Sequence, residues 1–133
     1  MTLKRSALAL GAAALMTASL TGCGGSGGAP AGASKDAFCG AWGSVKAAND
    51  EGSSRAAFTA IQAAVAQLKD VGTPSDITTD AKAGYDVLVD AVLKATWKDV
   101  KGANGAGAFA ASSPADRPKL AAFVSWVGQE CPA

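Results

Sequence analysis

Residues 54–68 read SRAAFTAIQAAVAQL, and this stretch decides the fold class. Its apolar side chains recur every three or four residues, which is the spacing of one face of an α-helix. They are Phe58, Ile61, Ala64, Val65 and Leu68. Ser53 or Ser54 can cap the start, because a serine oxygen accepts a hydrogen bond from a free backbone N–H of the first turn. Gly72-Thr73-Pro74 ends the helix, since proline is tolerated only in a first turn. The stretch therefore predicts an amphipathic helix.

The same spacing recurs in three other stretches, and each predicts a further amphipathic helix. The first follows Ser34, a candidate N-cap, ends at residues 49–52 and carries Phe38, Ala41, Trp42 and Val45. The longest begins near Thr79 and carries Tyr85, Leu88, Val89, Val92, Leu93 and Thr96. The last carries Leu120, Phe123, Val124 and Val127.

The last helix has clear boundary signals. Ser113-Pro114-Ala115-Asp116 combines a serine N-cap, a proline in the first turn and an acid that approximates a capping box, while Gly128 and Pro132 mark the end. Four amphipathic helices joined mostly by short turns are typical of a bundle with up-down-up-down topology. We therefore predict an all-α fold, a small four-helix bundle.

The N-terminal segment has the pattern of a secretory signal peptide. A basic start with Lys4 and Arg5 precedes an apolar run over residues 6–20. A helix of that length rises only about 22 Å, less than the roughly 30 Å of a hydrocarbon layer, which disfavours a transmembrane helix. Export is therefore the expected fate of the chain.

Leu20-Thr21-Gly22-Cys23 closes this segment. The four residues resemble the lipobox of bacterial lipoproteins, with leucine, two small residues and then cysteine. The resemblance implies cleavage before Cys23, a diacylglycerol with fatty acyl chains such as palmitate on its thiol, and anchoring to the outer, extracytoplasmic face of the cell membrane. Two acyl chains give stable anchoring. The alternative is an ordinary secretory signal whose cleavage falls near Cys23 by coincidence.

The chain divides into a signal peptide at 1–22, the lipidated cysteine and a tether at 23–34, and a helical domain at 35–133. The tether reads GGSGGAPAGAS from Gly24 and predicts a flexible linker. Cys39 lies near the start of the first helix and Cys131 just past the end of the fourth. In an up-down-up-down bundle these ends are neighbours, and two cysteines in an exported domain indicate a disulfide. The alternative is two free thiols. A cysteine after a glycine-rich tether and a closing Cys131-Pro132 resemble small helical lipoproteins of actinobacteria, a resemblance that implies no activity.

Little in the sequence points to catalysis or to a cofactor. The chain has no histidine, the commonest general base and metal ligand. Without Lys4 and Arg5 it has ten basic and eleven acidic residues and no charge run, so we expect no nucleic-acid partner, no metal and no cofactor. Lys82, Asp86, Asp90 and Lys94 form an i,i+4 series, interpreted either as a paired-carboxylate site or as a solvated helix face. Gly102 to Gly107 follows a helix, which disfavours phosphate binding.

The candidate partner surface consists of Trp97, at the edge of the third stripe, and Phe109, in the glycine- and alanine-rich loop. Exposed aromatic residues commonly anchor interfaces. The alternative is that both rings fold inward and cap the bundle. The first functional hypothesis is a membrane-anchored binding or interaction module for an envelope protein. The second is a carrier of an apolar small molecule, which a cavity above about 300 Å³ would favour. An enzyme is the third, and no catalytic residue is named.

Overall fold

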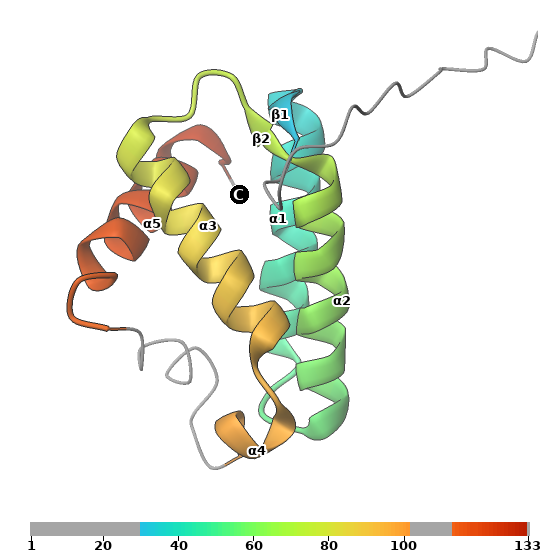
Figure 1. Cartoon of the computed structure of the whole chain (residues 1–133). Helices are drawn as coiled ribbons and strands as arrows, with labels where there is room; N and C mark the ends of the chain where they lie inside the picture. Colours follow the sequence, from blue (N-terminus) through green and yellow to red (C-terminus); the bar gives the residue numbers. More distant parts are fainter. Residues whose placement is uncertain (1–29, 102–112, 133) are drawn as a thin grey trace, which may run out of the picture.

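The computed structural model describes residues 30–101 and 113–132, and this part of the chain is mostly helical (Figure 1). Its elements are β1 (Ala31–Ala33), α1 (Lys35–Asp50), α2 (Arg55–Val71), β2 (Thr73–Pro74), α3 (Thr79–Lys94), α4 (Trp97–Val100) and α5 (Arg117–Glu130). The four long helices fall on the four apolar stripes, which confirms the predicted helical class. The sequence did not predict α4, β1 or β2. None of the helices in the described ranges is both long and apolar enough to cross a membrane.

The long helices pack mainly in two pairs. α1 lies along α2, and α3 lies across α5, as Figure 1 shows. The two pairs meet where α2 packs on α3, and there Gln62 Nε2 donates hydrogen bonds to the carbonyl oxygens of Val92 (3.1 Å) and Ala95 (3.0 Å). These carbonyls belong to the end of α3, where no intrahelical partner is available. Contact between α1 and α5 is much more limited.

An aromatic cluster fills the core between the two pairs. The ring of Phe38 lies 6.1 Å from that of Tyr85, 6.4 Å from that of Phe123 and 5.6 Å from that of Trp126, between ring centroids. Edge-to-face pairs at such distances add stability beyond the area that they bury. Phe38, Tyr85 and Phe123 are fully buried. One residue from each of α1, α3 and α5 thus holds the three helices together.

Side-chain caps define the starts of three helices. Ser34 Oγ accepts a hydrogen bond from Ala37 N (3.2 Å), and Ser54 Oγ accepts one from Ala57 N (3.0 Å), so both serines are N-caps as predicted. Thr78 Oγ1 accepts one from Ala81 N (3.3 Å) at the start of α3. Each cap satisfies a backbone N–H that has no partner within its helix.

The predicted start of the last helix was wrong by a few residues. Ser113 does not cap a helix, because its hydroxyl donates to Asp116 Oδ2 (2.7 Å) and Asp116 N donates to the Ser113 carbonyl (2.9 Å). These bonds close a turn, and α5 begins only at Arg117 with Pro118 in its first turn. The third helix also ends earlier than its stripe suggested, at Lys94.

The predicted flexible tether is corrected at its C-terminal end. Ala31–Ala33 form β1, which pairs in parallel with β2. Thr73 N donates to the Pro30 carbonyl (2.9 Å), and Gly72 has a φ of +81°. A Cβ at residue 72 would lie 2.0 Å from that carbonyl oxygen, so only glycine allows the contact. Residues 1–29, including the expected signal peptide and the rest of the tether, lie outside the described residues.

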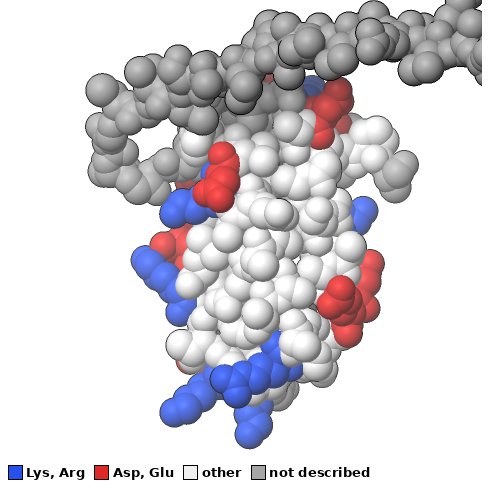
Figure 2. Space-filling view, turned by 90° about the vertical axis from the view of Figure 1, so that its right-hand side faces the viewer, with Lys and Arg blue, Asp and Glu red and all other residues white. Residues whose placement is uncertain are grey.

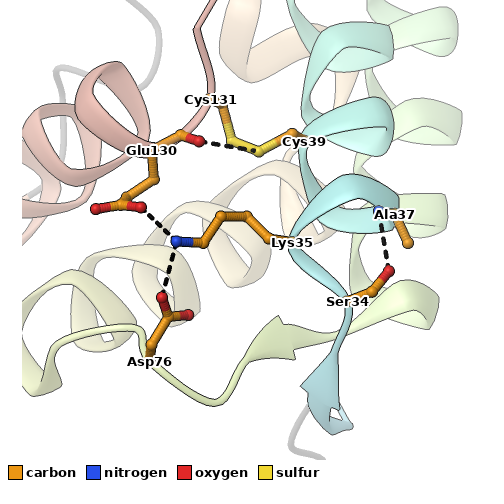
Figure 3. Close-up of a disulfide and its surroundings, with 7 residues drawn as sticks. All are labelled: Ser34, Lys35, Ala37, Cys39, Asp76, Glu130 and Cys131. Carbon is orange, nitrogen blue, oxygen red and sulfur yellow. Dashed lines mark hydrogen bonds and ion pairs between the residues drawn. A yellow bond between two sulfur atoms is a disulfide. The ribbon is translucent and has the colours of Figure 1, made fainter.

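The predicted disulfide is present. Cys39 and Cys131 are joined, with their Cα atoms 5.3 Å apart (Figure 3). Beside it, Lys35 Nζ lies between Glu130 and Asp76, and the distance to Asp76 Oδ2 is 2.8 Å. The hydrogen bond to Asp76 and then that to Glu130 hold the pKa of Lys35 above its usual value. This end of α1 is therefore attached to the end of α5 covalently and by charge.

Candidate functional site

A pocket of about 360 Å³ lies among the four long helices. Eight of the ten residues that line it are apolar: Trp42 and Val45 on α1, Ile61 and Val65 on α2, Leu88 and Val92 on α3, and Leu120 and Val124 on α5. The other two are Lys46 and Asn49 on α1. Sites for small molecules are concave, mostly apolar and about 300–1,000 Å³ in volume, so this pocket meets the usual description.

The helix pairing explains why the space is not filled. α3 approaches α5 closely at Gly84, where a Cβ would lie 2.0 Å from the Lys119 carbonyl oxygen. No comparable backbone approach joins α1 to α5 in the described ranges, where the disulfide, the Lys35–Glu130 ion pair and the aromatic cluster join the two helices. Away from the aromatic cluster, the apolar side chains of the two helices therefore line a pocket instead of interlocking.

Aromatic packing marks one end of the pocket. The Trp42 ring, part of the pocket wall, lies 5.2 Å from the Phe123 ring in an edge-to-face arrangement. Phe123 in turn belongs to the cluster around Phe38, on the side of the disulfide. The pocket is thus bounded toward the disulfide by packed rings.

The other side of the pocket is open to solvent. Val124 is 61% exposed, the highest value among the large apolar residues of the described ranges. Lys46 and Asn49 are exposed as well. An apolar side chain in water at the edge of an apolar pocket is a surface that a ligand can cover. A small molecule therefore has access to the pocket.

The carboxylates with shifted pKa values lie away from the pocket. The hydrogen bond from Lys35 lowers the pKa of Asp76, those from the Thr96 hydroxyl and backbone lower that of Asp99, and those from Ser113 and Lys119 lower that of Asp116. Asp76 forms an ion pair with Lys35, Asp99 accepts hydrogen bonds at the start of α4, and Asp116 closes the turn before α5. The pocket walls in the described ranges contain no carboxylate. The pocket is chemically suited to hold an apolar group.

The predicted partner surface is only partly described. Trp97 begins α4, is half-buried, and lies with its ring 5.9 Å from that of Phe58. That packing favours the alternative that Trp97 caps the helices. Phe109 lies outside the described residues, as do Leu20, Thr21, Gly22 and Cys23 of the lipobox. The predicted pairing of Trp97 with Phe109 therefore lies outside the described residues.

The charged series on α3 is a solvated face. Lys82 Nζ lies 2.9 Å from Asp86 Oδ2 and Lys94 Nζ lies 2.7 Å from Asp90 Oδ1, and all four side chains are well exposed. Each carboxylate has its own lysine, so no carboxylate pair forms. Figure 2 shows a further face of the molecule, on which the described charged side chains lie around the margin of a broad uncharged area.

The spacing of apolar residues in the sequence identified the residues that line the pocket, but it did not indicate that they enclose one. All eight apolar lining residues belong to the predicted stripes, where they were expected to fill the core. Lys46 and Asn49 were missed, although they continue the stripe of Trp42 and Val45 at i+4 and i+7 from Trp42. The presence of two polar residues at apolar positions of a stripe was the signal that could have identified them as part of a site.

No protein-family model, no curated protein and no solved structure matches this chain. The function of this chain is therefore inferred from the pocket and its lining residues.

Proposed function

We propose that this domain binds an apolar small molecule in the pocket between α1 and α5. The observation that carries the proposal is a cavity of about 360 Å³ with walls that are apolar on all four long helices. An apolar cavity of about 150 Å³ is enough to bind benzene. Each methylene group that a ligand buries there contributes about 0.8 kcal/mol. Carrier or binding activity is thus favoured over the docking of an envelope protein at Trp97 and Phe109.

The proposal includes a lipid anchor at Cys23. The lipobox resemblance of residues 20–23 supports it and would place the domain on the outer face of the membrane. Because Pro30 and β1 are attached to β2, residues 24–29 alone would separate the lipidated cysteine from the attached part of the chain. Six residues span at most about 22 Å. The domain would then stand close to the bilayer, with its disulfide end toward it.

An up-down-up-down arrangement of α1, α2, α3 and α5 is part of the same proposal. The pairing of α1 with α2 and of α3 with α5 supports it, as does the disulfide between the start of α1 and the end of α5. In this arrangement every long helix contributes to the pocket.

Titration with an apolar fluorescent probe tests the binding proposal. N-phenyl-1-naphthylamine is titrated into the purified, oxidised protein and its own emission is followed. We expect saturable binding, and we expect Leu120→Trp to abolish it, because the larger ring would occupy the pocket. Ala121→Trp is the matched control, since Ala121 is exposed on the same helix and does not line the pocket.

Two results would overturn this proposal. One is a wild-type protein that gives no saturable signal. The other is equal binding by both tryptophan variants when circular dichroism shows that both remain folded.

Cell fractionation tests the anchor. In Cys23→Ser the thiol that accepts the diacylglycerol is gone, so the protein should appear in the medium or as an uncleaved precursor, without label from radioactive palmitate. A variant that still fractionates as a mature, acylated membrane protein would contradict the lipobox interpretation.

A further inference from the structure

The pocket has a polar end on α1. Trp42, Val45, Lys46 and Asn49 all line it and follow one another along one face of the helix. The first two are apolar and the last two polar, so the wall changes from apolar to polar toward the C-terminal end of α1. Lys46 and Asn49 are exposed, whereas Val45 is buried. The pocket therefore has an apolar interior and one cationic, hydrogen-bonding edge.

Within the described ranges, no acidic side chain forms an ion pair with Lys46. All eleven acidic residues of the chain lie within the described ranges. Those that form ion pairs do so with Lys35, Lys82, Lys94 and Lys119. Asp50, one turn after Lys46 on the same helix, forms no ion pair with it within these ranges. Lys46 is also the only charged residue that lines the pocket in the described part of the chain.

We infer that the ligand is a single-chain amphiphile with a carboxylate head, the chemistry of a free fatty acid. Its hydrocarbon chain would lie against Ile61, Val65 and Val92, and its carboxylate would meet the Lys46 ammonium. The Asn49 amide adds a donor that can hydrogen-bond the second carboxylate oxygen. This inference rests on the proposed binding function and adds the charge and the orientation of the ligand.

The argument for an anion is charge complementarity. A cationic head would face Lys46 with a like charge, and a neutral head would form no ion pair with it. A carboxylate forms an ion pair at the solvent edge, where the gain is modest, about 0.2–1 kcal/mol. Apolar burial therefore supplies most of the affinity, and Lys46 selects the head group.

The test compares decanoate, below its micellar concentration, with decanol, below its solubility limit, as competitors of N-phenyl-1-naphthylamine. The two ligands share a chain and differ in the charge of the head. We expect Lys46→Gln to lower the ratio of decanoate affinity to decanol affinity by about 1.4- to 5-fold, the range of an exposed ion pair. Decanol affinity itself should not change. High salt should lower the wild-type ratio in the same direction.

Lys98→Gln is the matched control, because Lys98 is exposed on α4 and does not line the pocket. Its ratio should equal that of the wild type. If Lys46→Gln leaves the ratio unchanged while the probe still binds, the inference about the head group is wrong and the pocket function stands. If neither the probe nor either ligand binds the wild-type protein, the proposed function fails and the inference fails with it.

Discussion

Gly84 shows how a single residue sets the distance between two helices. It lies in the interior of α3, where glycine costs about 0.5–1 kcal/mol relative to alanine. In exchange, α5 comes so close that a Cβ at residue 84 would meet the Lys119 carbonyl oxygen at 2.0 Å and the Phe123 Cβ at 2.8 Å. Backbone atoms cannot rotate away as a side chain can. The approach of α3 to α5 therefore depends on this glycine.

We predict that Gly84→Ala destabilises the domain by about 1–3 kcal/mol, the usual cost of overpacking. Thermal unfolding followed by circular dichroism measures the effect. Gly43→Ala is the control, because Gly43 lies in the interior of α1 and a Cβ at that position would have nothing within 4 Å. That change should stabilise by up to about 1 kcal/mol. Equal stability of the two variants would show that α3 does not need the close approach.

Tyr85 is the only tyrosine of the chain and is fully buried. Its hydroxyl donates to the Leu68 carbonyl oxygen (3.1 Å), which also accepts a bond from Gly72 N. Burial, with smaller contributions from the charges of Asp86 and Asp70, raises the pKa of Tyr85 to about 12. The folded state thus favours the neutral phenol, which joins α3 to the end of α2.

This pKa predicts a loss of stability at alkaline pH. Because the folded pKa lies above that of the unfolded chain, the stabilising contribution is complete below pH 10 and is lost as pH rises to about 12. Absorbance at 295 nm reports the single phenolate directly, and it should rise together with unfolding. Tyr85→Phe should cost about 1 kcal/mol at neutral pH through the lost hydrogen bond. It should also weaken the alkaline dependence, and an ordinary titration near pH 10 in the folded protein would contradict the prediction.

At the scale of elements, β1 and β2 attach the entry of the chain to the helices. The pairing is made by backbone groups, and Thr73 and Pro74, the two residues of β2, are buried. Gly72 serves it in two ways, through its positive φ and through the space that its missing side chain leaves for Pro30. No side-chain periodicity accompanies such a contact, which is why the sequence indicated only a linker here.

We predict that Gly72→Ala releases β1. Limited proteolysis should then cut near residues 30–34, and thermal unfolding should occur at a lower temperature. Gly52→Ala isolates the contribution of backbone strain, because Gly52 has a φ of +99° but nothing within 4 Å of its Cβ position. It should cost about 1–2 kcal/mol without exposing the N-terminal segment. Identical protease patterns for the two variants would mean that the clash with Pro30 is not important.

At the scale of the whole molecule, the domain is two helix pairs joined on opposite sides. On one side α2 packs on α3, and on the other the disulfide and Lys35 attach α1 to the end of α5. The pocket occupies the region between these attachments. Its shape is therefore a property of the whole assembly and of no single helix.

We predict that Cys39→Ala/Cys131→Ala lowers the free energy of unfolding by about 2–4 kcal/mol, because the disulfide closes a long loop in the unfolded chain. Chemical denaturation of the variant, and of the wild type with and without reductant, measures this. Binding of the apolar probe should weaken as well, since the disulfide is the covalent link that supports the aromatic packing of α1 on α5 at the end of the pocket. Full stability and full probe binding after reduction would show that side-chain packing alone holds α1 to α5.

Much of this protein was determined by its sequence alone. The apolar stripes determined that it is helical and which face of each long helix is buried, Ser34 and Ser54 determined where two helices begin, and the cysteines at the two ends indicated the disulfide. The stripes and the caps are local signals, and the disulfide is a pairing between two cysteines that the sequence shows directly. The start of α5 was missed because the Ser113 hydroxyl could either cap a helix or bond to the Asp116 carboxylate, and the sequence does not show which of the two it does.

Only the tertiary structure decided that the stripes enclose a pocket. A stripe shows which side chains avoid water, and it is the same whether they meet across an interface or line an empty space. That outcome depends on the distance between helices, which the backbone contact at Gly84 and the Cys39–Cys131 link help to set. The identity of Lys46 and Asn49 as the polar edge follows from the same geometry, because a residue becomes part of a site only when other helices surround it.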